Sequence, residues 1–373
     1  MDLKLFACGD VVNFKSNKNF ICDDLKSIIQ TCDLSICNFE APIIDNNSKP
    51  IKKAGPTIHQ SKDSIKYLKD TGFKIVSVAN NHIYDYGQQA LLKTLNEISL
   101  NKLEYIGAGA NYNEAYTPKI ITKKNIRIGF LAACENEFGC MFEENNSGGY
   151  GWLFSPIFEK QIIEIKKSVD FVIVNAHAGV ESIDFPLIEW RDHYKKLCDL
   201  GADVIIGHHP HIPQGYEKYN DSIIFYSLGN FYFDASEFEN STDDSFSVIL
   251  NLNKEKKLDF ECIYHKKING QTRLVEKAQV NFNLDELCRY FENQSLYKEL
   301  NNSLSIKLFE DYYEDYYRVA LGRNPKRYNF FKKMIKNIFF KKKLNGILLL
   351  HNIRIESHRF LVQRALRYLY ERN

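Results

Sequence analysis

The segment Val204-Ile-Ile-Gly-His-His-Pro-His211 decides the fold, because an apolar strand in it runs directly into a cluster of histidines. Its first three residues form a short apolar run of β-branched side chains, which is typical of a strand with both faces covered. Gly207 follows, and then come His208, His209 and His211. Other parts of the chain repeat this order of an apolar strand followed by polar side chains.

Short runs rich in Val, Ile and Phe recur up to about residue 230, and stretches with helical spacing separate them. This spacing predicts helices over 61–71, 88–100 and 190–200, and a glycine follows the first and the last of them. Strands that alternate with helices predict an α/β fold of layered sheets flanked by helices. The predicted strands are 3–8, 34–37, 73–78, 126–131, 171–174, 204–206 and 223–226.

The pattern changes in the last third of the chain. Three consecutive strand candidates, 245–252, 258–265 and 272–280, predict antiparallel strands that close the domain. The sequence after them has the character of helices. We therefore predict a layered domain over 1–281 and a basic, mainly helical C-terminal region over 282–373.

Composition excludes several classes of protein. The chain has 373 residues, of which 44% are hydrophobic and 13% aromatic, so it is not a disordered chain. No apolar run approaches the roughly 20 residues that span a bilayer. Nine cysteines are spread singly without a C-x-x-C pair, which indicates reduced thiols in a cytosolic protein. The chain opens on a strand-like segment, so we expect no signal peptide or N-terminal anchor and a cytoplasmic location.

The small overall charge of +2 hides a strongly basic tail. From Arg318 onward, 15 Lys and Arg face two Glu, a net charge of +13, so the rest of the chain carries −11. Such a tail suggests an anionic partner, either a membrane surface or nucleic acid. Docking of the tail on the acidic body of the protein is the alternative.

Within the tail, 330–343 is a basic amphipathic pattern with aromatic residues four apart, such as Phe331 and Phe339 on either side of Ile335. This favours peripheral contact with the inner face of a membrane through 318–343. Aromatic spacing of this kind also occurs in domain cores. Nucleic acid is a poor fit, because phosphate backbones need cations beside the binding cleft and the body is acidic.

Six of the predicted strands end on side chains that bind metal ions. The carboxyl ends of strands in an open α/β sheet meet at one edge, where sites form. Carboxylates, amides and imidazoles suit Mn, Fe or Zn, and the absence of cysteine from the set argues against structural zinc or an iron–sulfur cluster. Two such ions about 3.5–4 Å apart can activate water and neutralise a phosphoryl group. The strand-end residues are Asp10, Asn38, Glu40, Asn80, Asn81, His82, Asn175, His177, His208, His209, His211 and Asn230.

Alternate residues of extended backbone point the same way, so His209 and His211 could each offer a ring to one of two adjacent ions. His208 would then point away from the ions, and we assign it a structural place behind the ligands. The remaining histidines are expected to be ordinary core or surface residues. They are His59, His193, His265, His351 and His358.

With these motifs assembled, the sequence resembles the CapA-type capsule and poly-γ-glutamate synthesis protein family, which belongs to the calcineurin-like metallophosphoesterase superfamily. The resemblance covers about residues 3–235 and implies a metallophosphoesterase-like sheet sandwich. The matching segments are Gly9-Asp-Val11, Asn38-Phe-Glu-Ala-Pro-Ile43, Ala79-Asn-Asn-His82 with Asp85-Tyr-Gly87, Gly107-Ala-Gly109 with Asn111, His177-Ala-Gly-Val-Glu181, Gly201-Ala-Asp203 running into Gly207–His211, and Ser227-Leu-Gly-Asn-Phe231.

The resemblance also implies roles for the strand-end residues. Asp10 and His211 would hold a first metal ion, and Glu40 would bridge it to a second. That second ion would be held by Asn81, His177 and His209 as well.

Next to these ligands, the resemblance implies that His82 acts as the acid on the leaving group or stabilises the transition state. Asp85 would orient the ring of His82. Asn38, Glu181, His208 and Asn230 would lie in the same cleft.

Two departures from the wider superfamily bear on the number of ions. The first motif, Asp10-Val-Val12, lacks the histidine that the superfamily carries there, and Glu40 stands where Asp is usual. The first ion would have fewer protein ligands, so we expect one or two divalent ions.

The resemblance favours a metal-dependent phosphoesterase that acts on a phosphorylated small molecule or glycan in capsule or surface-polymer biosynthesis. The alternative is a non-catalytic subunit of a membrane-associated synthesis complex that binds metal or polymer. Two further expectations concern the cleft. The glycine-rich stretch 135–154 could form a flap over it, and Lys49, Lys52 and Lys53 are the nearest candidate cations for a phosphate.

Overall fold

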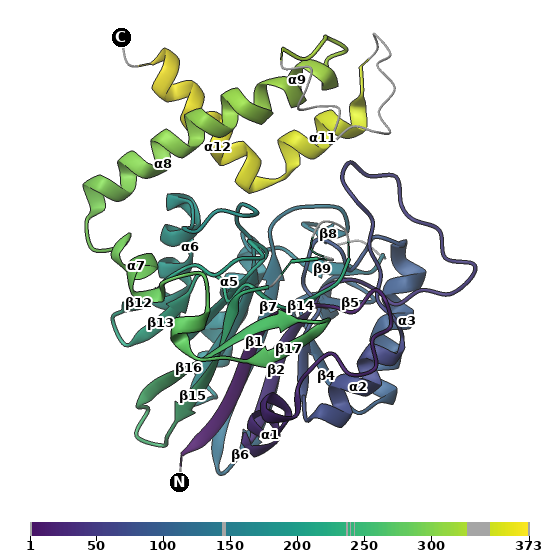
Figure 1. The fold of residues 1–373 in the computed structure, drawn as a ribbon, viewed down its shortest axis with the longest axis vertical. Helices are drawn as coiled ribbons and strands as arrows, with labels where there is room; N and C mark the ends of the chain where they lie inside the picture. Colours follow the sequence, from purple (N-terminus) through teal and green to yellow (C-terminus); the bar gives the residue numbers. More distant parts are fainter. Residues whose placement is uncertain are drawn as a thin grey trace.

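The computed structural model describes residues 2–143, 147–235, 238, 240–241, 243–326 and 344–371. Figure 1 shows the strands at the centre of the molecule, helices outside them, and a group of C-terminal helices beyond one end of the strands. The predicted α/β class, with layered sheets, flanking helices and a C-terminal helical appendage, is confirmed.

The first sheet has a parallel half and an antiparallel half that meet at β1. β1 pairs in parallel with β2 and with β14, and β2, β3 and β4 continue the parallel half. The antiparallel half joins β1 through β15 to β16 and β17. The strands are β1 (Leu3–Val12), β2 (Leu34–Phe39), β3 (Ile75–Ser77), β4 (Glu104–Ile106), β14 (Asn230–Phe233), β15 (Ser245–Leu252), β16 (Leu258–Ile268) and β17 (Gln271–Leu274).

The strand predicted over 272–280 is wrong in its second half. β17 ends at Leu274, and Lys277–Gln279 forms a 3-10 turn instead. Glu276 caps this turn, and the side chain of Gln279 bonds back to the backbone of Glu276. This reciprocal capping satisfies the backbone of the turn and so competes with strand pairing.

The second sheet is parallel at its centre, where β7, β10, β11 and β13 lie side by side. Antiparallel strands β6 and β12 form its two edges. A smaller sheet joins β5, β9 and β8. The bounds are β6 (Lys119–Lys123), β7 (Ile126–Cys134), β10 (Phe171–His177), β11 (Val204–His208), β12 (Tyr216–Tyr219), β13 (Ser222–Phe225), β5 (Ala108–Gly109), β8 (Cys140–Met141) and β9 (Gly149–Gly151).

The two large sheets share one hydrophobic core. Leu5 and Ile36 from the first sheet belong to the same buried cluster as Phe130, Ile173 and Phe225 from the second. Helices α1, α2 and α3 add their buried residues to this cluster, whereas α5 and α6 pack on the other face of the second sheet. The bounds of the helices before residue 200 are α1 (Asp23–Thr31), α2 (Asp63–Thr71), α3 (Gly87–Leu100), α4 (Tyr112–Tyr116), α5 (Pro156–Lys166) and α6 (Ile188–Asp199).

The C-terminal helices lie over the end of the sheets at which the parallel strands finish (Figure 1). Tyr313 and Leu361 from these helices share a buried cluster with Trp190 of α6, so the helices pack on the body of the protein. The predicted boundary at 281/282 falls between the 3-10 turn and the first of them. They are α7 (Leu284–Arg289), α8 (Gln294–Leu308), a π-helical turn (Phe309–Tyr313), α9 (Glu314–Ala320), α11 (Gly346–Arg354) and α12 (Glu356–Tyr370).

The amphipathic pattern at 330–343 lies outside the described residues. Peripheral membrane contact through 318–343 therefore stays a prediction. Among the residues that the structure describes, no helix combines the length and the apolar character needed to cross a bilayer.

Two buried histidines outside the strand-end cluster should make the fold sensitive to acid. Burial lowers the pKa of His265 to about 3 and that of His193 to about 4. The unfolded chain titrates near 6.5, so below that pH it takes up protons that the folded chain does not. The contribution of these two histidines to the free energy of unfolding should therefore be fully present above about pH 6.5. As the pH drops toward 4, the free energy of unfolding should fall by on the order of 3 kcal/mol for each histidine.

Urea unfolding at pH 7 and pH 4, in the presence of a chelator, measures this effect. His265→Gln should lose less stability between the two pH values than the wild type does. An equal loss in both proteins would show that His265 does not supply the acid sensitivity.

Candidate metal centre

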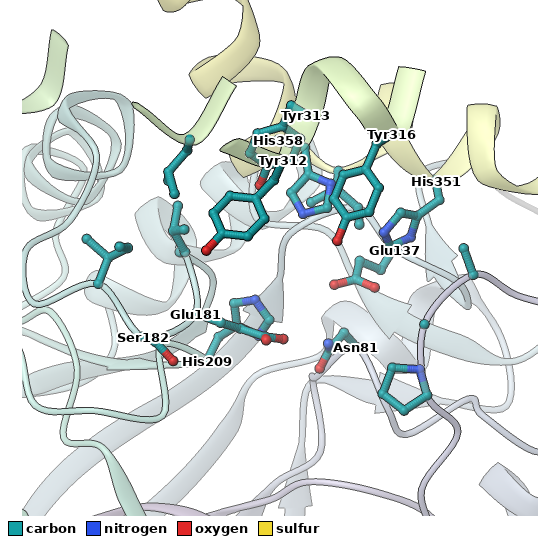
Figure 2. Close-up of a pocket in the computed structure, with 18 of the residues that line it drawn as sticks. Asn81, Glu137, Glu181, Ser182, His209, Tyr312, Tyr313, Tyr316, His351 and His358 are labelled. Carbon is teal, nitrogen blue, oxygen red and sulfur yellow. The ribbon is translucent and has the colours of Figure 1, made fainter. Parts of the chain in front are cut away.

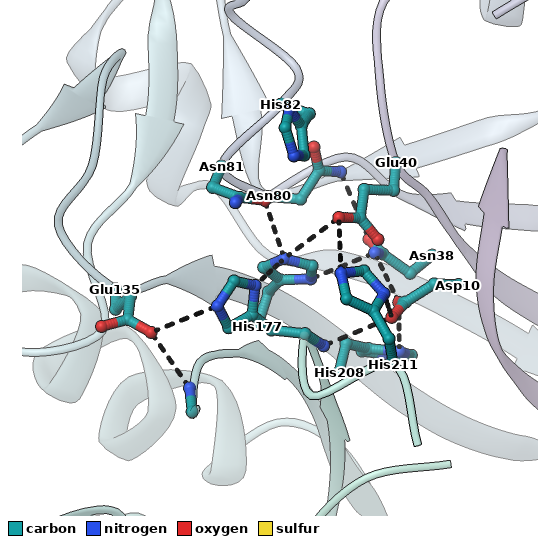
Figure 3. A network of polar contacts seen from close by, with 12 residues as sticks. Asp10, Asn38, Glu40, Asn80, Asn81, His82, Glu135, His177, His208 and His211 are labelled. Atoms are coloured by element: carbon teal, nitrogen blue, oxygen red, sulfur yellow. Dashed lines mark hydrogen bonds and ion pairs between the residues drawn. The ribbon is translucent and has the colours of Figure 1, made fainter. Parts of the chain in front are cut away.

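Neighbouring parallel strands deliver the polar side chains to one buried site, as Figure 3 shows. Asp10 lies near the end of β1, Asn38 near the end of β2, and Glu40 directly after β2. His177 is the last residue of β10, and His208 is the last residue of β11. These four strands run two to four residues further than predicted, so several of these side chains belong to the strands themselves.

Asp10 is fully buried and has polar partners on both carboxylate oxygens. Its Oδ1 accepts a hydrogen bond from Nδ2 of Asn38 at 2.8 Å and lies 3.3 Å from Nδ1 of His208. Its Oδ2 accepts from the backbone N–H of His209 at 3.3 Å and lies 3.5 Å from Nδ1 of His211. Asp10 is thus the residue that ties β1 to the histidine loop after β11.

Gly9 lets Asp10 reach this position. A Cβ atom at Gly9 would lie 1.7 Å from the carbonyl oxygen of Gly229. The same carbonyl accepts the N–H of Asp10 at 3.1 Å, where β1 meets β14. Only glycine allows this close approach of two backbones.

Glu40 is the most unusual residue in the site, because it is fully buried and neither carboxylate oxygen has a hydrogen-bond partner. Its Oε1 lies 3.7 Å from Nε2 of His177 and 3.9 Å from Nε2 of His211. A buried carboxylate without partners is costly, unless a cation compensates its charge.

Further potential ligand atoms converge beside this carboxylate. Nε2 of His177 lies 3.1 Å from Oδ1 of Asn81 and 3.2 Å from Nδ1 of His209. Among the described residues, three groups have ligand atoms that all lie within 4.8 Å of one another, and the first two share Glu40. The groups are Glu40, His177 and His209; Asp10, Glu40 and His211; and Glu181, His209 and His211.

The histidine loop does not have the extended backbone that the sequence suggested for His209-Pro-His211. His209 has φ 96° and His211 has φ 62°, both in the left-handed region. Ala41, directly after Glu40, has φ 142°. Such conformations cost about 1–3 kcal/mol each for residues other than glycine, and they concentrate at functional sites. In this strained conformation both rings reach the site.

His208 has Nδ1 3.3 Å from Oδ1 of Asp10 and Nε2 3.3 Å from Oδ1 of Asn175. Asn230 lies behind His211, whose Nδ1 is 3.0 Å from Oδ1 of Asn230. Asn230 in turn donates to Oδ1 of Asp243 at 3.2 Å. Asn38 lies 3.1 Å from Nδ1 of His177, so it joins that ring to Asp10.

The electrostatics of the site favour a bound cation. Burial, and then the charge of Asp10, raise the pKa of Glu40 well above its usual range. Burial would raise the pKa of Asp10 too, but hydrogen bonds to His208 and His211 hold it well below its ordinary value. Burial would lower the pKa of His211, but Glu40 and Asp10 raise it to about 10. A proton is therefore retained among these groups, and a divalent ion could replace it.

His82 and Asp85 lie beside this centre. Nδ1 of His82 is 2.6 Å from Oδ2 of Asp85, which also accepts the backbone N–H of Ile58 at 2.8 Å. Lys53, one of the three candidate phosphate cations, forms a buried ion pair with Asp85 and lies 3.4 Å from Nδ1 of His82. Asp85 therefore compensates the charge of Lys53. Burial lowers the pKa of His82 below its ordinary value.

Sequence reasoning missed two buried carboxylates in 135–154. Glu135 is fully buried 3.9 Å from Nε2 of His209, and burial, followed by the charge of Glu356, raises its pKa well above the usual range. Burial raises the pKa of Glu137 to about 7. The described part of this stretch contains β8 and β9, and Tyr150 within it is fully buried, so it is a packed part of the fold and not a flap.

A cavity of about 560 Å³ opens next to the centre, and the C-terminal helices form one side of it, as Figure 2 shows. Asn81, His82 and His209 line it from the strand ends, together with Glu181, which is exposed inside it. Tyr312, Tyr313, Tyr316, His351 and His358 line it from the C-terminal helices. Both histidines were expected to be ordinary, and only their place in the fold brings them here.

The fold and the site together define the class of this protein. It is an α/β sandwich with a buried histidine–carboxylate centre, suited to divalent metal ions, at the carboxyl ends of its parallel strands. Residues 4–235 match the family described as bacterial capsule synthesis protein PGA_cap. The chain belongs to this family.

Sequence matches to two curated relatives cover more than half of the chain. It is 35% identical over 243 residues to the PGA biosynthesis protein CapA of Bacillus subtilis, with 64% of this chain and 62% of the relative covered. It is 30% identical over 231 residues to the capsule biosynthesis protein CapA of Bacillus anthracis, with 60% and 56% covered. The match thus spans less than two thirds of each relative.

Solved structures with a partly similar arrangement include a 5'-nucleotidase precursor from Thermus thermophilus. It has a TM-score of 0.44 at 12% identity, with 82% of this chain and 60% of that chain covered. A 5'-nucleotidase from Candida albicans has a TM-score of 0.43 at 13% identity, with 70% and 52% covered.

Proposed function

We propose that this protein is a divalent-metal-dependent phosphoesterase that acts in capsule or surface-polymer biosynthesis. The observation that carries the proposal is Glu40, a buried carboxylate without a hydrogen-bond partner that two groups of metal ligands share. The place in surface-polymer biosynthesis is supported by the family and by the names of the Bacillus relatives.

In the proposed centre, Asp10, Glu40 and His211 would hold one ion, and Glu40, Asn81, His177 and His209 the other. A divalent ion of the Mn, Fe or Zn type supplies Lewis acidity, which polarises a phosphoryl oxygen and lowers the pKa of water. Asn38, His208 and Asn230 would hold the ligands in place from behind.

His82 would exchange a proton with the leaving group of the substrate. Asp85 engages Nδ1, which leaves Nε2 as the nitrogen available to the substrate, and the ring lines the cavity. Lys53 and the N–H of Ile58 hold Asp85 in turn, so the ring is oriented by a fixed carboxylate. The substrate would be a phosphorylated small molecule or glycan.

The purified full chain, loaded with Mn²⁺, should hydrolyse a generic aryl phosphate. His82→Ala should lower kcat by about 10²- to 10⁴-fold, the usual contribution of a general acid, and should leave metal binding intact. His59→Ala is the matched control, because His59 contacts Phe14 and Tyr86 and lies outside the metal centre.

Unchanged hydrolysis in His82→Ala would refute the assignment of this residue. Tight metal binding without hydrolysis of any phosphoester would instead support the non-catalytic accessory role.

A further inference from the structure

The cavity beside the metal centre is far larger than a phosphate needs, because about 560 Å³ is the size of a site for a whole small molecule. One wall belongs to the region that matches the family, and the other belongs to the C-terminal helices, which lie beyond residue 235. With a phosphoryl group at the candidate metal centre, the C-terminal wall would face the rest of the substrate.

We propose that the C-terminal wall binds a neutral, hydroxyl-bearing sugar ring attached to the phosphoryl group. Tyr312, Tyr316 and His351 would contact this ring from one side, and Glu137 and Glu181 from the other. The proposal rests on the proposed function in one respect, namely that the phosphoryl group lies at the metal centre.

The aromatic residues supply the first argument. Figure 2 shows the side chains of Tyr312 and Tyr316 reaching from the C-terminal helices into the cavity, with their hydroxyl groups toward the wall that carries Glu137 and Glu181. A tyrosine offers an apolar face and a polar tip, so it can cover the C–H face of a sugar and also bond a hydroxyl. Leu304 and Leu308 extend the apolar part of this wall.

The helix itself is built to present these side chains. α8 continues through a π-helical turn, Phe309–Tyr313, into α9. π-helical turns within α-helices are frequent at functional sites. Tyr312 and Tyr316 are four residues apart around the end of this turn, so they lie on the same face of the helix.

The charges of the cavity supply the second argument. Glu137 and Glu181 both line it, and among the described lining residues the lysines are Lys53 and Lys307. Lys53 is engaged by Asp85, so one lysine faces Glu181 and Glu137, and burial raises the pKa of Glu137 to about 7, which leaves it partly ionised near neutral pH. Carboxylates accept hydrogen bonds from sugar hydroxyls and repel further anions. The cavity thus disfavours a polyanion such as a chain of glutamates.

Isothermal titration of the Mn²⁺-loaded full chain with glucose 1-phosphate tests the proposal without requiring turnover. The double variant Tyr312→Ala/Tyr316→Ala should bind this probe about tenfold more weakly or worse, since it loses two aromatic contacts. Tyr312→Phe/Tyr316→Phe keeps the rings and loses the hydroxyls, so its loss should be smaller. Tyr370→Ala, 70% exposed on α12, is the matched control and should bind as the wild type does.

A short γ-linked glutamate oligomer serves as the competing probe. The proposal is overturned if the oligomer binds the wild type more tightly than glucose 1-phosphate does. It is also overturned if the Phe and Ala variants, shown to be folded by circular dichroism, bind glucose 1-phosphate as the wild type does. The aryl phosphate assay tests the proposed function separately. If the wild type hydrolyses the aryl phosphate but the variants bind glucose 1-phosphate as the wild type does, this inference alone is overturned. If the variants lose glucose 1-phosphate binding but the wild type does not hydrolyse the aryl phosphate, the proposed phosphoesterase activity alone is overturned.

Discussion

Glu40→Gln should stabilise the metal-free protein and abolish its response to metal. In the wild type, burial and Asp10 raise the pKa of Glu40, so at pH 7 the folded chain must either hold a proton there or bury a charge that has no hydrogen-bond partner and is compensated only across 3.9 Å by His211. Glutamine has nearly the same shape and carries no charge, so this cost disappears. The melting temperature in a chelator should therefore be higher for the variant than for the wild type.

Adding metal should reverse the order of the two melting temperatures, so that the wild type becomes the more stable protein. Mn²⁺ at about 100 times its dissociation constant would stabilise the wild type by about 2.7 kcal/mol. The variant lacks the carboxylate that both groups of ligands share, so its melting temperature should not respond. Its aryl phosphate hydrolysis should fall by about 10³-fold, as expected when charge stabilisation at the reacting group is lost.

Thermal unfolding of both proteins, with chelator and with Mn²⁺, measures these effects. Glu261→Gln, the same substitution at an exposed position of β16, should behave as the wild type in both conditions. A variant that is less stable than the wild type in chelator, or that still gains stability from Mn²⁺, would show that Glu40 is not the shared ligand.

Glu135→Ala should destabilise the fold by about 3 kcal/mol and loosen the C-terminal helices. Glu135 accepts the backbone N–H of Gly179 at 3.0 Å, the N–H of Ser357 at 2.9 Å and the hydroxyl of Ser357 at 3.0 Å. Ser357 lies in the first turn of α12, so Glu135 caps this helix from the body of the protein. Alanine would leave buried donors without partners, and each such donor costs about 1–3 kcal/mol.

Urea unfolding gives the loss of stability, and limited proteolysis reports whether the C-terminal helices detach. Glu164→Ala removes an exposed carboxylate of α5 that pairs with Lys167 on the surface, and it should leave the urea midpoint unchanged. A Glu135→Ala protein with wild-type stability and an intact C-terminal region would mean that other contacts hold α12 in place.

The candidate ligand set could be proposed from the sequence because its members lie at or after the ends of predicted strands. Asp10 and His177 lie in the last residues of β1 and β10, and Glu40 and Asn81 lie in the segments after β2 and β3. The parallel topology brings these strand ends together. The backbone of the histidine loop could not be predicted, since the left-handed φ of His209 and His211 depends on contacts with Asp10 and Asn230.

The sequence by itself determined the α/β class, and it indicated the carboxyl-end location of the candidate site and the chemistry of its candidate ligands, because hydrophobic period and strand-end composition are local properties of the chain. Only the tertiary structure decided that Glu135 contacts the first turn of α12 and that Tyr312, Tyr316 and His351 line the cavity beside the candidate metal centre. The contact between Glu135 and Ser357 joins residues 222 positions apart. Such contacts follow from how a helix packs across the sheet ends, and the residues near each partner in the sequence carry no sign of them.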